Sequence, residues 1–110
     1  MQIEARDDSG VVIVEPVGDI DGKTAPEFQT RILELVQPKA RIVLNLAQVA
    51  FMSSAGLRSM LLIYREAKSV DARVVLAVVN KDIRNSMSAT GFLPFFTVCD
   101  SVQDAMQEAS

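Results

Sequence analysis

The segment FMSSAGLR, residues 51 to 58, places two adjacent hydroxyl groups between an apolar stretch and an amphipathic one. A serine that precedes a helix accepts a hydrogen bond from an otherwise unpaired backbone N–H, so Ser54 is expected to cap the helix that follows. The same hydroxyl could instead act as a nucleophile or accept a phosphoryl group. Three kinds of chemistry therefore compete at this junction.

The composition of the chain argues against a catalytic role for the serine as a nucleophile. The chain contains no histidine, and its serines form neither a GxSxG nor an SxxK pattern, so a base for the serine is missing. Cys99, the only cysteine, follows Phe95 and Phe96 and is expected to be a buried structural thiol. We therefore predict that the chain is not an enzyme and binds no metal or cofactor.

Phosphorylation remains as the sharper alternative to a simple cap. A phosphoserine adds about −1.5 to −2 charges and three acceptor oxygens. The positive end of a helix dipole stabilises such a charge, so the modified domain need not unfold. A partner packed against the same surface would meet the dianion, which makes the serine a switch in binding.

The bulk composition narrows the class of protein. The 110 residues form one globular domain, residues 1–110, with a net charge of −3 and no cluster of basic residues, which argues against nucleic-acid binding. The longest uncharged stretch, residues 42–57, is too short to span a bilayer, and the polar start is no signal peptide. We expect a cytoplasmic protein, a monomer or weak dimer, whose partner could present a basic face.

Strand and helix patterns alternate along the chain. Strands are predicted at residues 2–7 (an edge strand), 11–18, 41–46, 73–79 and within 92–98, with Pro16 interrupting the second ladder. Helices are predicted after a Thr24–Glu27 capping box until Pro38, from Ser54, after an Asn80 or Asp82 cap until Gly91, and after a Ser101–Asp104 capping box.

The helical spacing also predicts which side chains face the core. The predicted inward residues are Phe28, Ile32, Leu35 and Val36, then Leu57, Met60, Leu61, Tyr64 and Lys68 on one face, then Ile83 and Met87, and finally Val102, Ala105, Met106 and Ala109.

The alternation predicts an α/β domain with a mixed, mostly parallel sheet of four to five strands covered by about four helices. Sites in such sheets form where strand carboxyl ends meet helix amino ends. The loop with Asp19 and Asp21 follows one strand and Ser54 follows another, so we expect all three at one rim. Two carboxylates on a loop more often mark a solvated turn than a cation site.

Three ordered motifs resemble the STAS domains of bacterial anti-sigma factor antagonists. The stretch RIVLNLAQVAFMSSAGLRSML resembles the family's strand, loop and serine-glycine helix start. VGDIDGKTAPEF is similar to the family's acidic loop and first helix, and ARVVLAVVNKDIRNSMSATGFLPFFTV to its later strand, helix and T-G segment. The resemblance covers nearly the whole chain.

The resemblance implies particular site residues. Ser54 matches the family's phosphoacceptor, and Ser53, which replaces an aspartate, is the alternative hydroxyl. Asn45 occupies a strand position where the family has Asp or Asn. The implied partner-binding residues are Asp19, Asp21, Ser53, Ser54, Ala55, Gly56, Leu57 and Arg58.

The resemblance also implies a mechanism, partner switching. The unphosphorylated domain would bind a GHKL-type serine kinase that is also an anti-sigma factor. Phosphorylation of Ser54 by that kinase would end binding, and a PP2C-type serine phosphatase would reset it. The alternative is a non-switching STAS subunit of a transporter or other regulatory complex.

Overall fold

The first two strands form a tight hairpin. The computed structural model describes residues 1–110, beginning with β1 (Gln2–Asp8) and β2 (Val11–Val17), which pair antiparallel from Gln2 with Val17 to Asp8 with Val11. Only Ser9 and Gly10 separate the strands, and both have positive φ, 56° and 87°. Two such residues in succession are the requirement of the hairpin turn whose twist matches that of the strands.

Three further strands extend the sheet in parallel. β3 (Arg41–Asn45) pairs with β2, β4 (Arg73–Ala77) with β3, and β5 (Thr97–Cys99) with β4, which gives the order β1-β2-β3-β4-β5. The central strands are rich in valine, isoleucine and leucine because both of their faces are covered. The predicted mixed, mostly parallel sheet is confirmed, with β1 as an edge strand.

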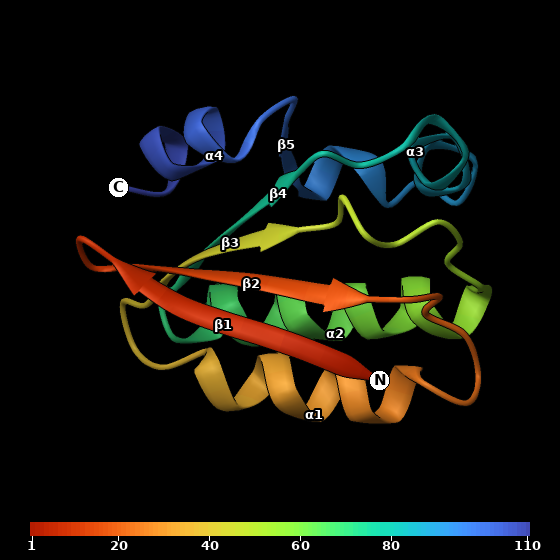
Figure 1. Ribbon diagram of the computed structural model, residues 1–110, viewed down its shortest axis with the longest axis horizontal. Helices are drawn as coiled ribbons and strands as arrows, with labels where there is room; N and C mark the ends of the chain where they lie inside the picture. The colour runs from red at the N-terminus through yellow and green to blue at the C-terminus, as the bar shows by residue number, and fades with distance from the viewer.

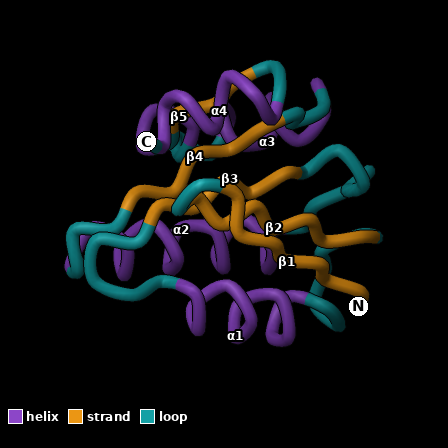
Figure 2. The backbone as a smooth tube through the Cα atoms, turned by 60° about the vertical axis from the view of Figure 1, so that its left-hand side comes forward, coloured by secondary structure: helices purple, strands orange, loops and turns teal.

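Helices cover the two faces of the sheet unequally. α1 (Ala25–Leu35) and α2 (Ser54–Ser69) lie side by side on one face, and α4 (Val102–Ala109) lies on the other (Figures 1 and 2). α3 (Lys81–Ala89) and the short 3₁₀ helix η1 (Leu93–Phe95) connect β4 to β5. None of these helices has the length and apolar character needed to cross a bilayer.

The sheet separates two apolar clusters. The larger one packs between the sheet and α1, α2 and α3, and includes Phe28, Leu44, Met60 and Ile83. The smaller one lies under α4 and includes Ile13, Val43, Val75, Ala105 and Ala109. Successive residues of a strand point to opposite faces, so Val43 enters one cluster and Leu44 the other.

Several local predictions are confirmed. The side chain of Asn80 caps α3 by accepting from the Ile83 N–H at 2.8 Å, and Ile83 and Met87 are buried. Gly91 follows the end of α3 with φ 78°, as a helix-terminating glycine does. The Ser101 hydroxyl caps α4 by accepting from the Asp104 N–H at 3.1 Å.

The interruption predicted at Pro16 is confirmed for one side of β2 only. Pairing with β3 stops at Val14, whereas pairing with β1 continues through Pro16, which lies opposite Ile3. The short last strand predicted within 92–98 is confirmed as β5, which begins at Thr97 after the three residues of η1.

The inward face of α2 is rotated from the prediction. Leu57 and Met60 are buried as expected, but Ile63 and Ala67 complete the face, whereas Tyr64 lies at its margin and Lys68 is exposed. The rotation follows from the neighbours of α2, because the sheet and α1 cover a broad stripe that sequence spacing alone does not centre.

Candidate functional site

Two loops at the carboxyl-terminal edge of the sheet are joined by their backbones. The Gly18 N–H donates to the Gln48 carbonyl at 3.0 Å, the Ile20 N–H to Phe51 at 3.0 Å, and the Ser53 N–H to Ile20 at 2.9 Å. Ile20 and Met52 form an isolated parallel bridge. The acidic loop after β2 and the serine segment before α2 therefore lie side by side at one rim, as the sequence predicted.

Gly56 allows α2 to start against this junction. A Cβ on Gly56 would lie 2.6 Å from the Met52 Cγ and 2.8 Å from the Ile20 carbonyl oxygen. Real Cβ atoms do not make such contacts with backbone, so any larger residue must displace one of the loops. The glycine is required here by close packing rather than by an unusual φ.

The cap of α2 is Ser53, and the expectation that Ser54 caps the helix is wrong. Ser53 has extended backbone angles, φ −79° and ψ 177°, and its hydroxyl accepts from the Gly56 N–H at 3.5 Å. Ser54 is the first helical residue. The capping position requires non-helical backbone angles, and Ser53 has them.

The Ser54 hydroxyl is consequently free. Ser54 is exposed, and its side chain forms no hydrogen bond with the rest of the chain. Arg58, also exposed, follows four residues later and so lies on the same face one turn along α2. The first turn of α2 carries no acidic residue. Its helix dipole and Arg58 therefore both favour negative charge near Ser54.

The other residues of the serine motif divide by burial. Ala55 is half-buried, whereas Gly56 and Leu57 are buried and contribute to the packing of α2 on the domain. Of the stretch from Ser53 to Arg58, Ser54 and Arg58 are the exposed members. Gly56 and Leu57 thus serve the site by positioning it.

The acidic loop uses most of its polar groups internally. Asp21 Oδ1 accepts from the N–H groups of Lys23 at 2.9 Å and Thr24 at 3.2 Å. The Thr24 hydroxyl donates to the Asp19 carbonyl at 2.7 Å and accepts from the Asp21 N–H at 3.0 Å. The predicted Thr24–Glu27 capping box is therefore absent, because the threonine closes the preceding loop and does not cap α1.

These hydrogen bonds also favour the ionised form of the Asp21 carboxyl group. The N–H groups of Lys23 and then Thr24 stabilise its carboxylate and lower its pKa below 3.8. Asp21 is half-buried and holds the loop, whereas the Asp19 side chain is exposed and forms no hydrogen bond within the chain. Of the two predicted partner-binding acids, Asp19 is the one left free toward solvent.

Asn45 starts the loop that leads to the serines. Its amide Nδ2 donates to Glu15 Oε2 at 2.9 Å, and its Oδ1 accepts from the Ala47 N–H at 3.1 Å. The asparagine at this strand position thus ties the end of β3 to β2 and shapes the first turn of the loop.

Exposed apolar residues at the same rim were missed from the sequence. Phe51 is 54% exposed and lies three positions before Ser54, while Val17 ends β2 and Val78 follows β4. Val78 has φ 57°, a strained conformation for a β-branched residue. The only sequence signal for this surface was the position of Phe51, an aromatic residue in a loop between a strand and a helix. A loop residue has no strand face that must be buried, so its exposure could have been expected.

Cys99 ends β5, where its carbonyl accepts from the Val78 N–H at 3.1 Å, and it is half-buried rather than buried as predicted. Burial raises the pKa of its thiol, and the carboxylates of Glu108, Asp104 and Asp100 raise it further. A thiol with a raised pKa is a poor nucleophile. No group of three or more His, Cys, Asp or Glu side chains is arranged to hold a metal ion.

Comparison with known proteins gives a consistent set of relatives. The family model described as STAS domain matches residues 2–105. BtrV of Bordetella bronchiseptica, described as a candidate anti-sigma factor antagonist, is 29% identical over 97 residues, which cover 87% of this chain and 84% of BtrV. The anti-sigma F factor antagonist of Paenibacillus polymyxa is 26% identical over 110 residues, covering 98% and 94% of the two chains.

Solved structures share the fold. An anti-sigma factor antagonist from Mycobacterium paratuberculosis superposes with a TM-score of 0.83 at 26% identity, covering 98% and 92% of the two chains. Unphosphorylated SpoIIAA, also an anti-sigma factor antagonist, gives 0.79 at 19% identity with 97% and 95% covered. The murine anion transporter Slc26a9 gives 0.82 at 16% identity, with 94% of this chain and 18% of the transporter covered. The last two likenesses show the fold alone.

Proposed function

The chain belongs to the STAS domain family, and on that premise we propose that it is an anti-sigma factor antagonist that acts by partner switching. In this proposal the unphosphorylated domain binds a GHKL-type serine kinase that is also an anti-sigma factor, and so releases the sigma factor. The chain is then a substrate and a ligand, not a catalyst, and it works in the cytoplasm without nucleic acid or membrane.

The proposal rests on one observation: the two adjacent serines have different roles in the structure. Ser53 caps α2, whereas Ser54 is exposed and has no partner within the chain. A phosphoryl group on Ser54 would therefore cost the helix none of its hydrogen bonds. Ser54 is our proposed phosphoacceptor, and Ser53 is the alternative that its cap bond disfavours.

The surroundings of Ser54 support a switch in binding. Arg58 and the amino end of α2 stabilise the added charge within the domain. A kinase packed over Ser54, Asp19 and the exposed Phe51 would have to remove the phosphate and Arg58 from water against a surface that fits a neutral hydroxyl, at a cost of several kcal/mol. Removal of the phosphate by a PP2C-type phosphatase would restore the original surface.

The test uses a GHKL-type serine kinase encoded beside this chain, with ATP, and mass spectrometry to locate the phosphate. We expect phosphate on Ser54 in the parent and in Ser53→Ala, and none in Ser54→Ala. Ser54→Asp should weaken kinase binding at least about tenfold, while Ser54→Ala should bind as the parent does. Phosphate on another residue, or equal binding by Ser54→Asp, would contradict the proposal.

The alternative function is a non-switching STAS subunit of a transporter or other regulatory complex. Its support is the transporter domains that share the fold, among them that of Slc26a9. Co-purification of the chain with a transporter ATPase, together with no phosphorylation by the co-encoded kinase, would favour this alternative.

A further inference from the structure

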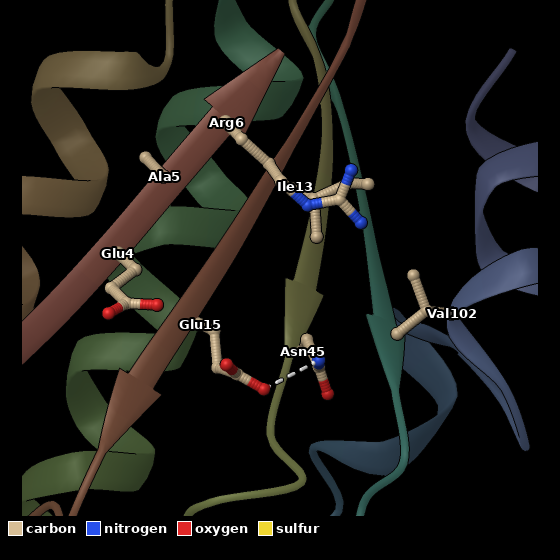
Figure 3. Close-up of a pocket in the computed structure, with 7 residues that line it drawn as sticks. All are labelled: Glu4, Ala5, Arg6, Ile13, Glu15, Asn45 and Val102. Atoms are coloured by element: carbon tan, nitrogen blue, oxygen red, sulfur yellow. Dashed lines mark hydrogen bonds between the residues drawn. The ribbon is translucent and has the colours of Figure 1, made fainter. Parts of the chain in front are cut away.

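The face of the sheet opposite α1 and α2 is only partly covered. α4 packs chiefly on β3, β4 and β5 and also covers Val11 and Ile13 of β2, but it leaves β1 and the carboxyl-terminal half of β2 without a helix on that side. A hollow of about 610 Å³ lies there and is lined chiefly by Glu4, Arg6, Ile13, Glu15, Asn45 and Val102 (Figure 3). We call this hollow the β1–α4 trough.

A second hollow of about 470 Å³ continues the trough along α4, between Asp8 and Val11 on the strands and Met106 on the helix. Val102 and Met106 lie one turn apart on α4, and both are half-buried. The two side chains thus form an apolar wall about one helical turn long, roughly 6 Å.

The rim of the trough carries unbalanced negative charge. Glu4 is directly opposite Glu15 across the β1–β2 ladder, and like charges in that position are destabilising. Neither carboxylate has a cationic partner: Glu4 accepts from the Gln2 amide at 3.2 Å and Glu15 from the Asn45 amide at 2.9 Å. The nearby Arg6 pairs with Asp8 at 3.4 Å.

Protection of an edge strand does not explain this pair. Charges on β1 discourage unwanted pairing at the sheet edge, but Glu15 belongs to the interior strand β2 and is half-buried. A half-buried carboxylate held toward a second carboxylate on an uncovered face is the arrangement that an incoming cation would neutralise.

We propose that the β1–α4 trough is a second docking surface, which receives a basic amphipathic helix of a partner protein. A lysine or arginine of that helix would lie between Glu4 and Glu15, and its apolar residues would contact Val102 and Met106. The helix would supply the cover that β1 and the carboxyl-terminal half of β2 lack on this face. Because the trough lies across the sheet from α2, occupation of the Ser54 rim would leave it accessible.

The test follows amide chemical shifts of the full chain by NMR. The probe is a synthetic helical peptide of about fourteen residues, with leucines along one face and flanking lysines, and its control has glutamates in place of the lysines. We expect the lysine peptide alone to shift amides of β1, β2 and α4. Binding that is equal for both peptides, or shifts centred on the start of α2, would overturn the proposal.

Variants separate the trough from general electrostatic attraction. The double variant E4Q/E15Q removes a repulsive pair, so it should fold at least as well as the parent, and should weaken the lysine peptide about fivefold. E66Q, an exposed site on α2, removes one negative charge and should bind as the parent does. Equal affinity of E4Q/E15Q and the parent would overturn the proposal.

A final NMR titration uses spermidine in place of the peptide. If spermidine shifted the same amides with the affinity of the peptide, the trough would be a site for a small polycation, and the partner-helix proposal would be wrong. The Ser54→Asp variant should bind the lysine peptide as the parent does, so failure here is distinguishable from failure of the phosphorylation switch.

Discussion

Two loops meet at the carboxyl-terminal rim, and they use their polar side chains in opposite ways. In the acidic loop, the side chains of Asp21 and Thr24 both form hydrogen bonds that close the loop before α1. In the serine segment, only the Ser53 side chain forms such a hydrogen bond, and the Ser54 hydroxyl has no partner within the chain. Both loops precede a helix, but only one presents an unused hydroxyl. The residue open to modification is the one that capping does not need.

The largest effect should come from the glycine that lets the two loops meet. Gly56→Ala places a Cβ against the Ile20 carbonyl and Met52, so we expect a loss of about 1–3 kcal/mol in the free energy of unfolding. Gly22→Ala, in the acidic loop, meets no atom within 4 Å and should change stability by less than about 0.5 kcal/mol. Urea denaturation measures both, and equal stabilities would refute the close contact.

The next effect concerns recognition at the rim and not stability. Phe51→Ser should weaken kinase binding about tenfold, because an exposed aromatic residue beside Ser54 offers the largest apolar contact there. Leu62→Ser is the matched control, since Leu62 is also exposed but lies farther along α2. Isothermal titration calorimetry provides the comparison. If both variants lost affinity equally, Phe51 would have no special role.

A smaller effect should distinguish the two serines. Ser53→Ala removes the cap of α2 and should cost about 0.5–1 kcal/mol, at the low end for a cap because its bond is 3.5 Å long. Ser54→Ala should change the free energy of unfolding by less than about 0.5 kcal/mol. Thermal and urea unfolding of the two variants checks the order, and a larger loss for Ser54→Ala would reverse our assignment of the cap.

The smallest effect should be the pH dependence contributed by the acidic loop. The folded pKa of Asp21 is lowered, so its stabilising contribution is complete above its ordinary pKa of 3.8 and disappears as the pH falls through the folded value. Asp21→Ala should therefore be less stable than the parent at neutral pH, with the gap closing in acid. Unfolding curves measured across that range provide the test, and a gap independent of pH would show that charge is not involved.

Much of the fold could be predicted because local signals agree with it. The valine-rich strands, the Asn80 and Ser101 caps and the terminating Gly91 each act within a few residues. The predictions that failed concern which of several possible partners a side chain finds. Thr24 fits a capping box in sequence, but its hydroxyl oxygen accepts from the Asp21 N–H in the preceding loop and not from the first turn of α1.

The candidate site shows the same division. The serine pair, the glycine and their place before a helix are visible in the sequence, and so is the resemblance to STAS domains. Which serine caps the helix was decided by the backbone angles of Ser53, which follow from its hydrogen bond to Ile20, more than thirty residues away. The exposure of Phe51 and the open face beside Glu4 and Glu15 depend on where the helices pack.

The sequence by itself determined the elements, their order and the chemistry present at the rim, because hydrophobic period, caps and turns are properties of neighbouring residues. The tertiary structure decided which polar groups were used internally and which remained free. Hydrogen bonds between loops and the unequal cover of the two sheet faces join residues far apart in the chain, and no local pattern records them.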